Sequence, residues 1–369
     1  MLQPLLTFSF PTPAARFYHN RPFQWKMVAV NPNTSFSHTE FLLLGFPEIS
    51  QSRHLLVIPF ISSYFLILLG NGLISYKICM KKSLHSPMYV LILLLLIWNI
   101  LYTNTVMPKL LLSIAFQLDQ ISLSGCLTQM FFMYVAGICE SYILLLMAMD
   151  RYVAICRPLR YHYIVTKRLL VQLVIVGLLR SIILGLLIVL FASKVQFCSS
   201  NVILNFSCEN MSVLSLGCGD ISKTHLVGLV VRILVIFPDG TFVLVSYLNI
   251  LCMAMKIAVG ESRQKAWKTC STHLLVTLMT HSCGLTSSIV YRVSGSMSLN
   301  VQNLVSLINF LIPATADPLI YGLRMSEIRK TLTVTWMQKL NHRAVRHTTR
   351  VLQKGGGTQE EHRNKAMQS

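Results

Sequence analysis

Ionisable side chains inside long apolar runs are the residues of this chain best placed to do chemistry. Glu140, Arg180, Arg232, Asp239 and Asp317 each stand among aliphatic and aromatic neighbours. A charge in such surroundings needs a partner, an ion pathway or a bound ligand, because burial of a lone charge is strongly unfavourable. The sequence presents no nucleophile with a matching base, and its ten Cys include no CxxC pair that would frame a metal site. We therefore expect binding and switching, with no enzyme activity, cofactor or metal centre.

The composition indicates a membrane protein. Of the 369 residues, 53% are hydrophobic and 12% are charged, whereas a soluble domain has about 25% charged residues. Lys and Arg number 32 against 13 Asp and Glu, giving a net charge of +19. The basic residues stand between the apolar runs and in the C-terminal tail, which favours membrane lipid as a partner and argues against nucleic acid.

Seven apolar runs are each long enough to cross a bilayer as a helix. They cover approximately residues 55–80, 88–115, 125–149, 169–192, 225–255, 269–291 and 303–323. Their length and the lack of a two-residue alternation predict helices and not barrel strands. The predicted fold is an all-α membrane protein, a bundle of seven transmembrane helices.

The distribution of Lys and Arg predicts the orientation of this bundle. Most basic residues flank the helix ends on the side that also carries the C-terminus, so the N-terminus is expected outside and the C-terminus in the cytoplasm. This divides the chain into an extracellular segment 1–54, a membrane domain 55–323 and a cytoplasmic segment 324–369 that begins as an amphipathic helix and continues as a basic tail. Either Met1 or Met27 could begin the chain. Glycosylation sequons begin at Asn33, Asn205 and Asn210, all on the predicted outer side.

The run 125–149 is followed by Asp150, Arg151 and Tyr152, which places an acid beside a permanent cation at the inner membrane edge. One interpretation is a pair that anchors the helix at the interface. Glu140 precedes Arg151 by eleven residues, three helical turns and roughly 16 Å, on the same helix face. Glu140 is therefore expected to point into the bundle.

The string MAMDRYVAIC at 147–156 resembles the rhodopsin-like G-protein-coupled receptor family, and specifically its odorant receptor branch. Matching motifs follow in the order of that branch: LHSPMY at 84–89, PKLL at 108–111, SY at 246–247, KAWKTCSTHL at 265–274 and DPLIY at 317–321. The resemblance covers about residues 41–330. It implies a plasma-membrane receptor in the perception of smell, which binds a small odorant inside the bundle. It also implies that the receptor activates a heterotrimeric G protein, of the stimulatory olfactory type, and so raises cyclic AMP.

The resemblance assigns activation roles to residues at the cytoplasmic ends of the helices. Arg151 would hold the helices 125–149 and 269–291 together at rest, restrained by Asp150. Tyr247 and Tyr321 would repack when the bundle opens. The same motifs contribute Tyr152, His273 and Pro318. The alternatives are interface anchoring for Arg151 and plain packing for the tyrosines.

A polar centre is expected deeper in the membrane. The family usually has Asp at the position of Asn99 and Asn at the position of Asp317, and this sequence has the two exchanged. The resemblance implies that these residues, with Asn71 and Glu140, could bind sodium. The alternative is a hydrogen-bond network that locks the packing. The resemblance also implies two disulfides, Cys126–Cys208 and Cys198–Cys218.

The ligand cavity of the resembled family lies between its third, fifth, sixth and seventh helices. Helical spacing selects the candidate lining residues, for which ordinary packing is the alternative. They are Met133, Tyr134, Gly137, Ile138, Arg232, Val235, His281, Gly284, Leu285 and Ser288. Arg232 needs a partner, and Asp239, a ligand carboxylate and water are candidates. We hypothesise that Arg232 helps to bind an anionic or strongly hydrogen-bonding odorant.

Two other functions fit a seven-helix membrane protein. A rhodopsin-like receptor for a small molecule outside the nose would have the same sequence features, since the fold does not encode the tissue. A transporter or channel is disfavoured, because transporters often contain internal repeats and this sequence shows none.

Overall fold

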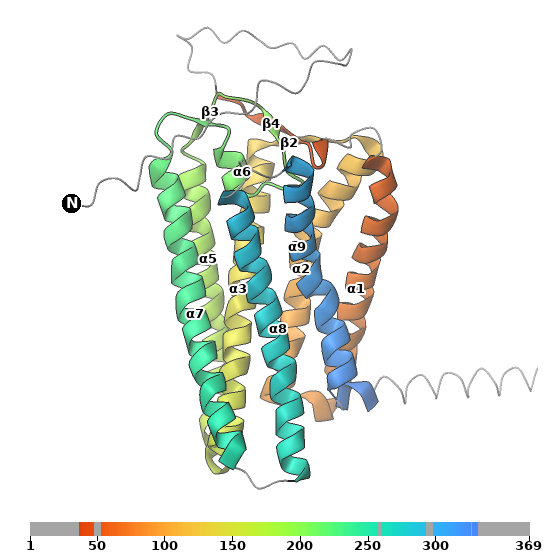
Figure 1. Ribbon diagram of the computed structural model, residues 1–369, viewed down its shortest axis with the longest axis vertical. Helices are drawn as coiled ribbons and strands as arrows, with labels where there is room; N and C mark the ends of the chain where they lie inside the picture. The colour runs from red at the N-terminus through yellow and green to blue at the C-terminus, as the bar shows by residue number, and fades with distance from the viewer. Residues whose placement is uncertain (1–36, 48–52, 257–259, 293–297, 326, 331–369) are drawn as a thin grey trace, which may run out of the picture. The chain divides into compact units, whose positions relative to one another are not determined.

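Long helices make up most of the structure, a computed structural model that describes residues 37–47, 53–256, 260–292, 298–325 and 327–330. The seven longest helices in this part of the chain run side by side (Figure 1): α1 (Val57–Met80), α2 (Pro87–Phe116), α3 (Leu123–Cys156), α5 (Lys167–Ala192), α7 (Ser222–Lys256), α8 (Glu261–Arg292) and α9 (Leu299–Arg324). Short helical elements connect them: η2 (Arg53–Leu56), η3 (Lys82–Leu84), η4 (Pro158–Arg160), α4 (Tyr161–Ile164) and α6 (Asn210–Leu214). The predicted all-α bundle is confirmed.

Six of these helices are apolar and long enough to cross a membrane, among the residues that the structure describes. The seventh long helix, α8, has Ser and Thr along its length. Their hydroxyls bond back to carbonyls of the same helix, as Thr272 does to Lys268 and Thr286 to Ser282. Such bonds make a polar helix tolerable in the bilayer. The helix begins at Glu261, eight residues before the apolar run that predicts it, because its first turns are polar.

The central helix is α3, which contacts α2, α5, α7 and α8. Its most apolar stretch is 67% buried, against 22% for the corresponding stretches of α1, α5 and α7. The outer faces of the peripheral helices expose large apolar side chains, including Phe65, Leu69, Leu190 and Phe237. Exposed side chains of this kind fit contact with lipid tails. Because α3 is the most buried of these helices, it is the element that can connect sites in the interior.

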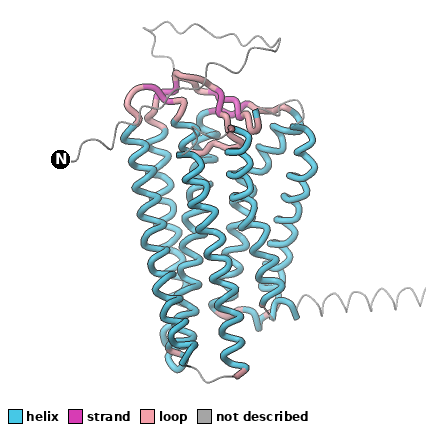
Figure 2. Tube along the Cα trace, viewed as in Figure 1, coloured by secondary structure: helices cyan, strands magenta, loops and turns pink. Residues whose placement is uncertain are grey.

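Short strands gather at one end of the bundle, called here the strand end (Figure 2). Strand β1 (Glu40–Leu43) pairs antiparallel with β2 (Gln120–Ser122), with Phe41 opposite Ile121. It also pairs in parallel with β4 (Val202–Ile203). A second pair joins β3 (Gln196–Phe197) to β5 (Gly217–Cys218). The segment before α1 therefore forms strand pairs with the loops that follow α2 and α5.

Side-chain caps define where three of the long helices begin. Ser122 Oγ accepts a hydrogen bond from the Gly125 N–H at the start of α3, and Thr166 does the same for Leu169 at the start of α5. Ser298 caps α9. Each cap satisfies one of the free N–H groups of a first turn.

Candidate functional site

A cavity of about 240 Å³ lies between α3, α7, α8 and α9, next to the loop that carries α6. Its polar lining comes from Tyr134, Glu140, Ser141, Ser207, Glu209, Arg232, Thr280, His281, Ser306 and Asn309. Its apolar lining includes Tyr102, Met133, Ile138, Ile188, Phe206, Val231, Val235, Ile236, Phe310 and Pro313. A few polar groups among apolar walls are typical of a site for a small molecule.

Most residues predicted to line the cavity do so. The lining includes Met133, Tyr134, Gly137, Ile138, Arg232, Val235, His281 and Gly284. Leu285 does not line it, because the α8 face toward the cavity runs through Thr280 and His281, and Leu285 is turned outward with 45% of its surface exposed. The side chain of Ser288 lies outside the described residues.

Near the strand end, the cavity wall contains a linked set of polar side chains. Tyr134 donates its hydroxyl to Glu209 Oε1 at 3.2 Å, and Glu209 Oε2 accepts from the N–H groups of Met211 and Ser212. Arg232 is electrostatically attracted to Glu209 and donates to the Gly284 carbonyl at 3.2 Å. Burial raises the pKa of the Glu209 carboxyl, and Arg232 and the two N–H groups oppose that rise. Glu209 is an acidic neighbour of Arg232 that the sequence alone does not indicate.

At the far wall of the cavity, Glu140 accepts a hydrogen bond from the Thr280 hydroxyl at 3.2 Å. Three other polar atoms of the cavity lining have no hydrogen-bond partner within the described part of the chain: Ser306 Oγ, Asn309 Nδ2 and His281 Nε2. Thr280, Ser306 and Asn309 were absent from the predicted lining. The spacing of Ser306, Asn309 and Pro313 along α9 is the signal that could have identified that face.

A second charged cluster joins α5 and α7 beside the cavity. Arg180 forms an ion pair with Asp239 at 2.9 Å, and Ser141 of α3 donates to Asp239 Oδ2 at 2.8 Å. The guanidinium also lies 5.6 Å from the centre of the Tyr142 ring. Asp239 therefore pairs with Arg180 and not with Arg232, because the neighbouring helix brings Arg180 closer than a residue seven positions away on the same helix.

The predicted polar centre is assembled between α1, α2 and α9. Asn99 Nδ2 donates to Asp317 Oδ2 at 2.9 Å and lies 3.3 Å from Asn71 Oδ1, and Asn71 donates to the carbonyl of Ala314. The Asn99 amide thus directs an N–H donor at the Asp317 carboxylate, and Asn71 joins α1 to this pair through its side-chain oxygen. These contacts form a hydrogen-bond network among Asn71, Asn99 and Asp317, and sodium binding at this centre stays a prediction.

At the end of α3 away from the strands, Asp150 Oδ2 lies 4.0 Å from Arg151 Nε. Tyr161 of α4 donates its hydroxyl to Asp150 at 2.7 Å, a contact that the motif alone does not predict. Tyr152, the residue after Arg151, packs against the buried cluster that includes Tyr247. The Asp150 carboxylate is therefore shared between the cation and the following short helix.

His273 of α8 and Tyr321 of α9 meet between these helix ends, with ring centres 5.6 Å apart. Tyr247, His273 and Tyr321 are buried, and their polar side-chain atoms have no partner among the residues described. Pro318 packs closely against Gly70 of α1, where an added Cβ would lie 3.2 Å from the proline ring. The structure thus brings His273 and Tyr321 into contact near these helix ends, and Pro318 lies against α1.

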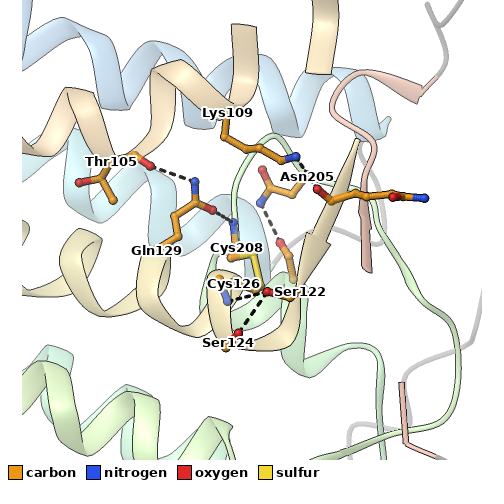
Figure 3. The surroundings of a disulfide bond; sticks show 11 residues. Thr105, Lys109, Ser122, Ser124, Cys126, Gln129, Asn205 and Cys208 are labelled. Carbon is orange, nitrogen blue, oxygen red and sulfur yellow. Dashed lines mark hydrogen bonds between the residues drawn. A yellow bond between two sulfur atoms is a disulfide. The ribbon is translucent and has the colours of Figure 1, made fainter. Parts of the chain in front are cut away.

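Both expected disulfides are present. Cys126 at the start of α3 is bonded to Cys208, and Cys198 is bonded to Cys218. Figure 3 shows Gln129 beside the first bond, where its side chain donates to the Thr105 carbonyl at 3.0 Å and accepts from the Cys208 N–H at 2.9 Å. The loop is thereby attached to α2 and α3 next to the cavity.

Two of the three sequons are buried. Asn205 is 1% exposed and donates its side-chain nitrogen to Ser212, and Asn210 is 3% exposed. A glycan on either nitrogen would disrupt this packing. Asn33 lies outside the described residues.

Comparison with known proteins decides the family. The family model for olfactory receptors matches residues 60–339. The chain belongs to the olfactory receptor family. Human olfactory receptor 52K1 is 33% identical over 306 residues, which cover 83% of this receptor and 98% of the relative. Human olfactory receptor 52B6 is 36% identical over 78% of this receptor and 85% of the relative.

The receptor also has the fold of squid rhodopsin. The crystal structure of that protein superposes with a TM-score of 0.59 at 17% identity, over 79% of this chain and 87% of the other. The receptor is therefore a multi-pass protein of the plasma membrane and not an enzyme. Its family implies a small-molecule ligand and a G protein as partners.

Proposed function

We propose that the receptor binds an odorant in the cavity between α3, α7, α8 and α9 and activates a stimulatory, olfactory-type G protein, raising cyclic AMP. In this proposal the strand end faces the outside and Arg151 lies at the cytoplasmic face. The observation that carries the proposal is that one buried helix, α3, both lines the cavity and ends in the Asp150–Arg151 pair.

The helix α8 provides the moving part in this mechanism. It contributes Thr280 and His281 to the cavity, and its buried His273 packs against Tyr321 near Arg151. We take α8 to have a resting position and an open position. A ligand shifts the equilibrium between them only to the extent that it binds one position more tightly than the other. The contact of Arg324 with Ser271, at 3.1 Å, is one link between α9 and α8 that opening would break.

The test is a measurement of cyclic AMP in cells that express the receptor and are exposed to a panel of volatile and water-soluble odorants. An Arg151→Ala variant with matched surface expression is the control. A ligand-dependent rise that disappears in the variant is the expected result. A rise of equal size in the variant would contradict coupling through Arg151.

A further inference from the structure

Arg232 has an acidic side chain near it in the cavity wall. Glu209 attracts it, and Glu209 is itself held by Tyr134 and two backbone N–H groups. A ligand carboxylate would have to compete with this carboxylate for the guanidinium. The nearby Glu209 carboxylate therefore counts against Arg232 as the anchor of an anionic odorant.

Glu140 is in the opposite situation. It is 7% exposed, it lines the cavity, and it accepts one hydrogen bond, from the neutral Thr280 hydroxyl. The ion pairs formed by the described residues do not include it. The nearby carboxyl of Asp317 interacts with it unfavourably, since both are acids. A cation is the group that this position lacks.

The lining of the cavity supplies further hydrogen-bonding capacity apart from Glu140. Ser306 is 5% exposed, and its hydroxyl lines the cavity without a hydrogen-bond partner in the described part of the chain. A hydroxyl can donate a hydrogen bond to a polar group of a ligand or accept one from it. Buried polar atoms are normally satisfied, so these atoms point to a polar group that arrives with a ligand.

The size of the cavity limits the rest of the ligand. A cavity of 150 Å³ holds a benzene molecule, so about 240 Å³ fits roughly ten non-hydrogen atoms. Apart from the two polar regions, the walls are apolar, with Met133, Ile138, Val235 and Phe310 among the lining residues. A compact hydrocarbon body with one polar end matches these walls.

We propose that the ligand is a small protonated amine, whose ammonium group pairs with Glu140 and whose apolar body, together with the nitrogen, amounts to about ten non-hydrogen atoms. This inference rests on the proposed function only in taking the cavity as the ligand site. It identifies Glu140, and not Arg232, as the charged anchor.

The experiment compares three ligands with the same carbon chain: hexylamine, 1-hexanol and hexanoic acid. Their binding to the full-length receptor in lipid nanodiscs is measured by the concentration dependence of thermal stabilisation. We expect hexylamine to bind at least about ten-fold more tightly than hexanol, because a hydrogen-bonded charge pair is worth that much in a dry site. Equal binding of the two, or tighter binding of the acid, would overturn the proposal.

Variants of the receptor test which residue causes the preference for the amine over the alcohol. Glu140→Gln should remove the preference for the amine over hexanol, and Glu140→Asp should keep part of it. The ratio of amine to alcohol within each variant is independent of the stability of that variant. Glu209→Gln is the matched control, since it removes a carboxylate from the other wall. It should keep the amine preference and strengthen binding of hexanoic acid by freeing Arg232.

The outcomes separate this inference from the proposed function. Amine binding that depends on Glu140 but raises no cyclic AMP would support the ligand class and contradict the signalling proposal. A cyclic AMP response to hexanol or hexanoic acid with no preference for the amine would support signalling and overturn the ligand class. An amine preference that survives Glu140→Gln would also overturn the assignment.

Discussion

Two adjacent residues of α3 face two buried carboxylate sites of opposite character. Ser141 contacts the site formed by Asp239 and Arg180, in which the carboxylate has a cation and a hydroxyl as partners. Glu140 belongs to the cavity, where its carboxylate has one neutral partner. Both carboxylates are at least nine-tenths buried. The difference shows that the partners of a buried charge, and not its type or depth, separate a site that holds helices together from one that can receive a ligand.

The site formed by Asp239 and Arg180, called here the closed site, is the more sensitive of the two to mutation. Arg180→Met leaves Asp239 without its cation between α5 and α7, so we expect destabilisation of about 3 kcal/mol or more. The measurement is the Tm of the purified receptor, together with the amount that reaches the cell surface. An Arg180→Met, Asp239→Leu double variant removes both charges and should recover much of the lost stability. If the double variant is as unstable as the single one, the ion pair is not the cause.

Packing around the closed site should have an intermediate effect. A Cβ added at Gly177 of α5 would overlap the ring of Tyr142, which must then move away from Arg180. We expect Gly177→Ala to destabilise the receptor by about 1–2 kcal/mol, again measured as a lowered Tm. Gly72 is a suitable control position, because an added Cβ there meets no atom within 4 Å. An equal loss of stability at the two glycines would show that the overlap with Tyr142 is not the cause.

The cavity site of Glu140, called here the open site, should tolerate removal of the charge of its carboxylate. Glu140→Gln keeps the shape of the side chain and an acceptor for Thr280, and it removes a charge that has no counter-ion among the described residues. The expected change in stability is therefore within about 1 kcal/mol. A fall in Tm as large as that of Arg180→Met would mean that Glu140 has a structural partner, and it would remove the contrast between the two sites.

The sequence predicts the helices and much of the α3 contribution to the cavity, because both depend on local periodicity. Met133, Gly137 and Glu140 follow one stripe of a helix, and the structure places all three in the lining. The partner of Asp239 could not be obtained in this way. Periodicity gives the face of each helix but not how far one helix is shifted along another, and that shift decides whether Arg180 or Arg232 reaches Asp239.

Loops are the second place where sequence reasoning stops short. Glu209 reaches the cavity because the Cys126–Cys208 bond holds the preceding residue against α3. No pattern in the sequence connects Glu209 with Arg232, which lies on α7. The buried state of Asn205 and Asn210 has the same origin, since sequons report only local composition and not the packing of the loop.

The pairing of β1 also constrains the order in which the receptor is made. Its strand partners β2 and β4 follow it in the chain, and β4 comes only after four long helices have been synthesised. At about 5–20 residues per second, translation from β1 to β4 takes many seconds, and during its second half residues 40–43 can join β2 but not yet β4. The strand end is therefore completed late in biosynthesis, and a nascent chain that stops before β4 leaves this edge open to other partners, including folding factors.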